Sequence, residues 1–204
     1  MVSVEALQTL GCDVQTLNAQ PDGSFPGRPS EPTAETLTGL CAQVGNSDAD
    51  LGVAHDGDAD RMMAVDETGA FVPKDVLLAL FARRAVQAAG GGQVAAPVDT
   101  SLCVDDAVTA AGGELVRTKV GDVFVAEAAA EPGAVFGGEP SGAWIWPDET
   151  LSPDGPLAAC KLAALVGSRG PLSELVDSVD TYPLSRDSIE VKNKAAVMER
   201  VTEG

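Results

Sequence analysis

Three aspartates at alternate positions, Asp56, Asp58 and Asp60, are followed directly by Arg61. Carboxylates brought this close repel one another unless a cation lies between them. Hard oxygen ligands in a compact loop are typical of sites for Mg²⁺ or another hard divalent ion, which often accompanies a phosphate group. The guanidinium of Arg61 is suited to bind phosphate oxygens at the edge of such a site. The spacing therefore predicts half of a phosphoryl-transfer centre.

Two other interpretations of this acidic loop stay open at this point. One is a solvated turn in an acidic protein. The other is a calcium loop of EF-hand type, because the three aspartates occupy its positions 1, 3 and 5 and Glu67 falls at position 12. That loop requires glycine at position 6, where Arg61 stands, and it requires helical flanks. Residues 49–54 and 62–66, on the two sides of the loop, instead predict strands.

A second motif, residues 135–144, is a glycine-rich turn that carries one carboxylate and one hydroxyl, Glu139 and Ser141. Side chains two residues apart in an extended loop project to the same side. A carboxylate and a hydroxyl together suit the vicinal hydroxyls of a sugar. Taken alone, the same residues also fit an ordinary hairpin-type turn.

The two motifs in this order resemble those of the α-D-phosphohexomutase family, which comprises phosphoglucomutase, phosphomannomutase and phosphoglucosamine mutase. Residues 21–33 resemble another segment of the family, residues 117–122 resemble its substrate loop, and Asp154-Gly155 also fits. The resemblance extends over nearly the whole chain. It implies an α/β fold class, with two mixed-sheet α/β domains of the phosphohexomutase type in tandem.

The resemblance also implies the second and third of the family's four domains. The boundaries we expect are 1–72 for an N-terminally truncated second domain with the metal loop, 73–183 for the third domain with the sugar-binding loop, and 184–204 for the start of the fourth. The family's catalytic serine and its fourth-domain phosphate loop have no counterpart here. We therefore expect the first and fourth domains in cis and little turnover by the chain alone. Val123 and Ala143 stand where many relatives carry a basic residue and a histidine.

The family reaction moves phosphate between C1 and C6 of a hexose phosphate through a phosphoserine. By resemblance, the three aspartates of the acidic loop would hold Mg²⁺, and Arg61 would act in catalysis by clamping the phosphate or orienting the sugar. The implied substrate-binding residues are Glu139, Ser141, Lys119, Gly121 and Asp122. An alternative is a non-catalytic sugar-phosphate-binding protein derived from the same fold. The resemblance does not select among glucose, mannose and glucosamine phosphates.

Composition limits the partners of the protein. The formal net charge of −18 argues against nucleic acid and against anionic membrane surfaces, because both repel an acidic surface. Few lysines and many carboxylates are typical of proteins adapted to high salt. The four cysteines are far apart and form no C-x-x-C pair, so we expect thiols in a reducing, cytoplasmic compartment. The longest apolar run, around Val76–Phe81, is too short to span a membrane.

The apolar pattern and the turn residues predict an alternation of helices and strands. Expected helices cover residues 4–10, 33–44, 75–88, 104–111, 124–130, 155–166 and 172–179. Expected strands cover residues 13–17, 51–54, 62–65, 93–97, 114–118, 134–136 and 144–146.

Overall fold

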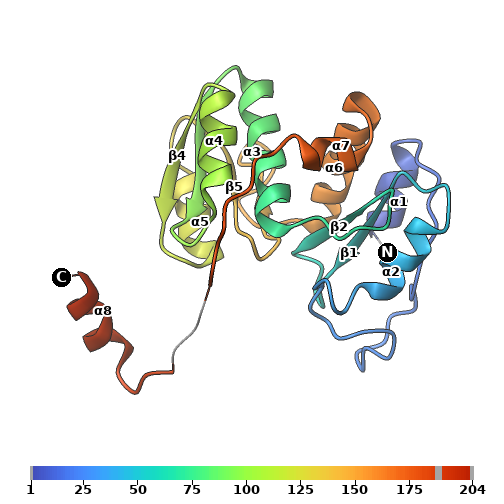
Figure 1. Ribbon diagram of the computed structural model, residues 1–204, viewed down its shortest axis with the longest axis horizontal. Helices are drawn as coiled ribbons and strands as arrows, with labels where there is room; N and C mark the ends of the chain where they lie inside the picture. The colour runs from blue at the N-terminus through green and yellow to red at the C-terminus, as the bar shows by residue number, and fades with distance from the viewer. Residues whose placement is uncertain (1, 187–189, 203–204) are drawn as a thin grey trace.

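The first unit of the fold holds the acidic loop between two strands. The computed structural model describes residues 2–186 and 190–202 (Figure 1). This unit consists of α1 (Val2–Thr9), α2 (Thr38–Gly45), β1 (Leu51–His55) and β2 (Met62–Asp66). The strands are antiparallel, and His55 pairs with Met62 at their shared end. That register brings the two ends of the acidic loop together, so the paired strands fix the backbone positions at which the loop begins and ends.

The second unit is a four-stranded mixed sheet covered by helices. Its strands are β3 (Gly92–Pro97), β4 (Gly113–Thr118), β5 (Ala134–Gly138) and β6 (Trp144–Ile145). The order in the sheet is β4-β3-β5-β6, in which β6 alone runs antiparallel to its neighbour. The helices that connect the parallel strands are α4 (Leu102–Ala110) and α5 (Asp122–Ala129), and α3 (Lys74–Ala89) precedes the sheet. Parallel strands require such crossovers, which explains the alternation.

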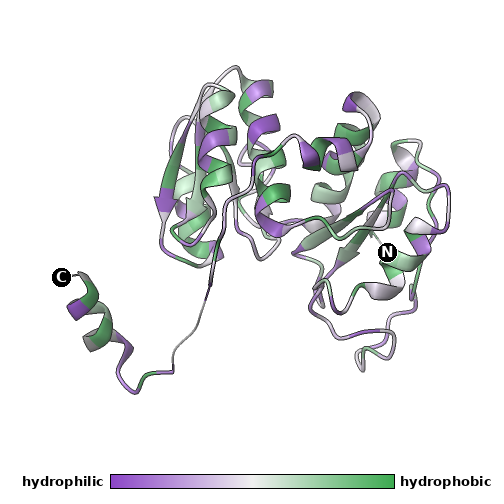
Figure 2. Cartoon of the chain, in the orientation of Figure 1, coloured by the Kyte–Doolittle hydropathy of each residue, from purple (hydrophilic) through white to green (hydrophobic). Residues whose placement is uncertain are grey.

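Alternate residues of β3 determine which helices cover each face of this sheet. Val94 packs in the main core with α3 and α4, whereas Ala95 packs with Val125 and Ala129 of α5. Successive side chains of a strand point to opposite faces, so both faces of β3 are buried. Figure 2 shows hydrophobic and hydrophilic residues alternating around α3 and α4, as expected for helices with one buried side.

Four aromatic rings form the centre of the main core. The ring of Phe81 in α3 lies 5.3 Å from those of Trp144 and Trp146, and Phe136 in β5 lies 5.2 Å from Trp146. The indole N–H of buried Trp144 donates to the carbonyl of Met62 in β2 at 2.9 Å. Edge contacts between rings and a satisfied indole stabilise this packing. The same tryptophan therefore links the sheet of the second unit to a strand of the first.

Two further helices hold the units together. Helix α6 (Gly155–Arg169) packs against α1, and α7 (Leu172–Asp177) packs against α3 (Figure 1). Asp154 caps α6 by accepting from the backbone N–H of Leu157 at 2.8 Å. The backbone N–H and hydroxyl of Ser173 in α7 both donate to the carboxylate of Glu67, in the turn after β2. A final helix, α8 (Lys194–Thr202), lies near the C-terminus.

The structure departs from the sequence-based elements at three points. Residues 13–17 form no strand, and the expected helix over 33–44 begins only at Thr38, after a turn in which Thr36 and Thr33 bind each other. Trp146 lies beyond the end of β6. Within the described ranges, residues 13–17 have no strand beside them, and an isolated strand leaves its backbone groups unpaired. Of residues 184–204, the expected start of the fourth domain, residues 187–189 and 203–204 lie outside the described residues.

Candidate functional site

The acidic loop brings its three carboxylates together. One oxygen from each of Asp56, Asp58 and Asp60 can be chosen so that all lie within 4.8 Å of one another. Asp58 is exposed at the tip, whereas the side chain of Asp56 is only 3% exposed. Ala59, which lies between Asp58 and Asp60, adopts φ 63°, a left-handed conformation that costs energy for a residue other than glycine. The aspartates predicted from the sequence thus form one cluster at the end of the β1–β2 pair.

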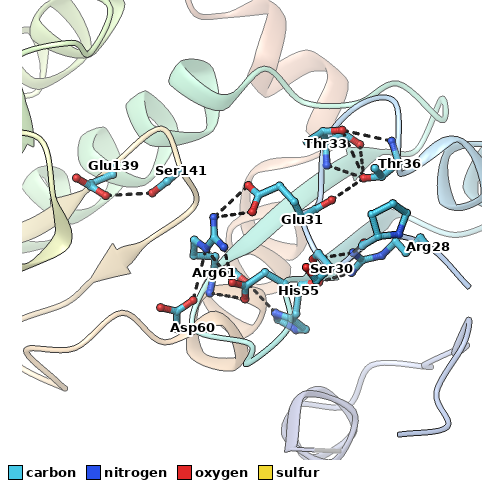
Figure 3. Close-up of polar contacts among 12 residues, drawn as sticks. Arg28, Ser30, Glu31, Thr33, Thr36, His55, Asp60, Arg61, Glu139 and Ser141 are labelled. Atoms are coloured by element: carbon cyan, nitrogen blue, oxygen red, sulfur yellow. Dashed lines mark hydrogen bonds and ion pairs between the residues drawn. The ribbon is translucent and has the colours of Figure 1, made fainter. Parts of the chain in front are cut away.

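Arg61 contacts three carboxylates, those of Asp56 and Asp60 in the acidic loop and that of Glu31 in a distant loop (Figure 3). Its Nε lies 3.6 Å from Oδ1 of Asp60. Its Nε and Nη2 each lie 2.8 Å from Oδ2 of Asp56, and its backbone N–H donates to Oδ1 of the same residue at 3.2 Å. Its Nη1 lies 3.0 Å from Oε1 and 2.8 Å from Oε2 of Glu31. The guanidinium therefore has a defined orientation beside the acidic cluster, as a positively charged group that can position an anion.

The pKa values of the cluster describe a site with excess negative charge. Burial raises the pKa of Asp56, but hydrogen bonds and the charge of Arg61 outweigh burial, so its net pKa lies below the usual range. For Asp60, burial and then the charges of Asp56 and Asp58 raise the pKa. Oδ1 of Asp60 is also buried without a hydrogen-bond partner among the described residues. A buried carboxylate oxygen that has only the 3.6 Å ion pair with Nε of Arg61, beside two other carboxylates, is the arrangement that a hard divalent cation relieves.

His55 and Gly155 contact backbone carbonyl groups of the acidic loop. Nδ1 of His55 lies 3.2 Å from the carbonyl oxygen of Arg61, and Nε2 lies 2.8 Å from the hydroxyl of Ser3 in α1. Burial lowers the pKa of His55, which favours the neutral ring. The N–H of Gly155, at the start of α6, donates to the carbonyl of Ala59 at 3.2 Å. A side chain at position 155 would begin 2.6 Å from that oxygen, so only glycine allows this approach.

The second motif places a buried carboxylate between two loops. Glu139 is 8% exposed; its Oε1 accepts from the backbone N–H of Gly121 at 2.8 Å, and its Oε2 accepts from the hydroxyl of Ser141 at 3.1 Å. This carboxylate therefore joins the glycine-rich loop to the loop of residues 119–122. Gly121, predicted from a different segment than Glu139 and Ser141, lies beside them.

A backbone contact joins the glycine-rich loop to the acidic loop. The N–H of Met62 donates to the carbonyl of Gly142 at 3.1 Å, and Arg61 forms an isolated antiparallel bridge with Ala143. Gly142 adopts φ 102°, a conformation that side chains rarely allow. The two motifs, far apart in the sequence, therefore meet through their main chains.

The remaining predicted residues, Lys119 and Asp122, are exposed at the edge of this region. Nζ of Lys119 lies 5.5 Å from the ring centroid of Phe124, and Asp122 accepts from the backbone N–H of Val123 at 2.9 Å. Among the contacts of the described residues, neither side chain hydrogen-bonds to Glu139. The structure thus brings the loop that carries them to Glu139 without bringing their charged groups into contact with it.

Sequence reasoning missed four charged residues at this site. Glu31 binds Arg61, and a hollow of about 280 Å³ beside Glu139 includes Lys74, Asp99 and Arg186. Its lining residues are Lys74, Pro97, Asp99, Val120, Glu139, Pro140, Ser141 and Arg186. Glu31 lies within residues 21–33, which resemble a segment of the family, and that resemblance was the available signal for it. Lys74 and Arg186 carried no local pattern that distinguishes them from surface residues.

Comparison with known proteins matches both units of the chain. Residues 73–182 match the family described as phosphoglucomutase/phosphomannomutase, alpha/beta/alpha domain III, and residues 1–69 match its domain II. A "Probable phosphoglucosamine mutase" of Methanothermobacter thermautotrophicus is 53% identical over 94% of this chain and 42% of its own length. One of Methanosarcina barkeri is 52% identical over 96% of this chain and 44% of its own length. The chain thus spans less than half the length of these relatives.

A solved structure supports the same assignment. A phosphoglucomutase/phosphomannomutase family protein from Burkholderia thailandensis superposes with a TM-score of 0.81 at 28% identity, covering 89% of this chain and 40% of that protein. In the part of the chain that the structure describes, every helix is too short or too polar to cross a membrane. The matches to both domains, together with relatives above 50% identity, show that the chain belongs to the phosphoglucomutase/phosphomannomutase family.

Proposed function

We propose that this chain supplies the metal loop and the sugar-binding loop of a Mg²⁺-dependent phosphohexomutase, which interconverts hexose 1-phosphate and hexose 6-phosphate through a phosphoserine. The observation that carries the proposal is the backbone contact between Met62 and Gly142. This contact joins the acidic loop to the loop that carries Glu139, the carboxylate that we propose binds the sugar hydroxyls. A phosphoryl-transfer enzyme for sugars needs both groups close together.

Asp56, Asp58 and Asp60 are the residues that would hold Mg²⁺. All three offer hard oxygen atoms, and Oδ1 of Asp60, which accepts no hydrogen bond from the described residues, fits a cation ligand. The bound metal would supply positive charge to offset the charge that develops on the transferring phosphoryl group. The flanking strands β1 and β2, where an EF-hand has helices, argue against a calcium module.

The other site residues would bind and orient the substrate. Arg61, held by Asp56 and Glu31, would present its remaining guanidinium surface to the phosphate or the sugar. Glu139 and Ser141 would bind the hexose hydroxyls, and Gly121 would keep its loop in place through its N–H. Lys119 and Asp122 would contribute from the edge of the pocket. The nucleophilic serine would come from a first domain in cis, so the chain alone should show little turnover.

Glucosamine phosphate is the first substrate to test, because several similar relatives carry the name phosphoglucosamine mutase. The experiment follows the conversion of glucosamine 6-phosphate to glucosamine 1-phosphate by the complete protein that contains this chain, with Mg²⁺ and with a chelator. Parallel assays use mannose and glucose phosphates. We expect turnover that requires the metal, and a fall of about 100-fold or more in kcat for Asp58→Asn.

The matched control is Asp48→Asn, which removes an exposed aspartate outside the acidic loop. It should retain normal turnover. If Asp58→Asn is as active as the control, the acidic loop is not the metal site. If the complete protein binds sugar phosphates without converting any of them, it is a non-catalytic binding protein and the mutase proposal fails.

A further inference from the structure

A groove lined by arginines lies on the second unit, between α3, α6 and α7. Helix α7 packs against α3 (Figure 1), and residues of α3, α6 and α7 line the groove. The groove has a volume of about 160 Å³. Its lining consists of three leucines, three arginines and one glutamine: Leu80, Leu165, Leu175, Arg83, Arg84, Arg169 and Gln87. We call it the arginine groove. Its lining combines apolar side chains with three permanent positive charges.

The charges of the arginine groove are not neutralised by neighbouring carboxylates. The chain has 31 acidic and only 13 basic residues, so most cations should find an acidic partner. Arg61, Arg117 and Arg186 all do. In contrast, within the described ranges none of the three arginines of the groove lies within ion-pair distance of an aspartate or glutamate. Their clustering gives a strongly acidic protein one local positive site.

Arg83 is the most constrained of the three. It is half-buried, and its Nη2 donates to the hydroxyl of Ser178 at 3.0 Å. Burial lowers the pKa of Arg83, and the charge of Arg169 lowers it further. A guanidinium with five N–H donors is therefore partly desolvated beside a like charge, and it donates a hydrogen bond to the neutral hydroxyl of Ser178. Bringing cations together in this way costs free energy that a bound anion would recover.

We propose that the arginine groove is a second binding site, specific for an anion that carries a phosphate group. Guanidinium groups bind phosphate oxygens through paired N–H donors, and a doubly charged anion matches more than one arginine. The leucines suit the carbon part of a phosphomonoester. Inorganic phosphate carries the same charged group as a phosphomonoester, so the test distinguishes between these two ligands.

The arginine groove is separate from the proposed catalytic site. Arg83 lies nine residues after Lys74 in α3, which is about 13 Å along the helix axis. Lys74 lines the hollow beside Glu139, whereas none of the residues that line that hollow also lines the groove. Binding in the groove therefore does not depend on the metal or on the mutase reaction, and it can be tested independently of both.

The test is a nuclear magnetic resonance titration of the ¹⁵N-labelled chain without Mg²⁺, following the side-chain Nε–H signals of the arginines. One series adds inorganic phosphate, a second adds phenyl phosphate, and a third adds NaCl to the same ionic strength. We expect saturable shifts of Arg83, Arg84 and Arg169 with a Kd below about 10 mM for at least one phosphate probe. Tighter binding of phenyl phosphate identifies a phosphomonoester site, and equal binding identifies a site for phosphate itself.

Variants separate the groove from general charge effects. The double variant Arg83→Gln/Arg169→Gln should weaken binding about tenfold or more. Arg84→Gln, at an exposed position, gives a second variant if the double variant unfolds. Arg200→Gln, an exposed arginine of α8, is the matched control, and Asp58→Asn should also bind normally. Shifts that fail to saturate, that NaCl reproduces, or that Arg200→Gln abolishes equally would overturn the proposal.

Discussion

Arg61 and Asp56 form a two-point ion pair at the base of the acidic loop, in which Nε and Nη2 of Arg61 each lie 2.8 Å from Oδ2 of Asp56. The same carboxylate is a candidate metal ligand. Arg61 therefore neutralises part of the cluster when no metal is bound. The loop can keep its shape in that state because Arg61 pairs closely with Asp56 and also lies 3.6 Å from Oδ1 of Asp60.

The first prediction concerns the removal of this partner. Arg61→Gln leaves the nearly buried carboxylate of Asp56 without a cation, and it should destabilise the metal-free chain by about 1–3 kcal/mol. Mg²⁺ should then raise the melting temperature more in the variant than in the native chain, because the metal replaces the missing charge. Calorimetry with Mg²⁺ and with a chelator measures both effects. An equal or smaller Mg²⁺ effect in Arg61→Gln would refute this role, and Arg200→Gln controls for loss of an arginine.

The second prediction concerns the carboxylate that joins the two loops of the sugar site. Glu139→Ala removes the acceptor for the Gly121 N–H and for the Ser141 hydroxyl. The amide hydrogen of Gly121 should exchange with solvent about tenfold faster or more in the variant, since its hydrogen bond is lost. Hydrogen exchange measured by nuclear magnetic resonance tests this, with exposed Glu131→Ala as the control. Unchanged protection of Gly121 would mean that Glu139 does not position this loop.

The third prediction is a pH dependence at the contact between the units. Burial raises the pKa of Glu67, but hydrogen bonds from Ser173 and backbone groups outweigh burial, so its net pKa lies below the reference value of 4.5. A carboxyl group with a lowered folded-state pKa stabilises the protein above its unfolded-state pKa, and this stabilisation is lost as the pH falls through the folded-state value.

Glu67→Gln should therefore lower the free energy of unfolding by about 1 kcal/mol at pH 7. The difference from the native chain should shrink as the pH falls below about 4.5, the reference value for this group. Urea unfolding across this pH range measures it. Exposed Glu114→Gln serves as the control for loss of a negative charge. A difference that stays constant with pH would show that the Ser173 contact does not depend on the ionised carboxylate.

The elements that the sequence predicts well are those with strong local patterns. Helix α3 has a continuous buried stretch from Val76 to Ala82 and ends before Gly90, which adopts φ 75°. The strands around the acidic loop are equally well marked. In contrast, residues 13–17 contain Val14 and Thr16, which favour a strand, but they lack a neighbouring strand in the described chain, and pairing is a property of the whole fold.

The residues of the candidate site also divide into those that the sequence predicts and those that it does not. The acidic cluster is contiguous in the sequence, so its spacing alone predicts it. Glu31 reaches Arg61 across a long loop, and the bridge between Arg61 and Ala143 joins the two units. Neither contact has a local signal. The arginine groove is assembled from separate helices, and single arginines on helices are ordinary surface residues until the fold brings them together.

The most direct test of the central claim is a Mg²⁺ titration of the chain by isothermal calorimetry, alongside Asp58→Asn and the control Asp48→Asn. Asp58 is exposed, so its replacement tests metal binding with little effect on the fold. We predict one Mg²⁺ site in the native chain and in Asp48→Asn, and an affinity at least about tenfold weaker in Asp58→Asn. Equal Mg²⁺ affinity in all three proteins, or no binding to any of them, would contradict the assignment of the acidic loop as the metal site.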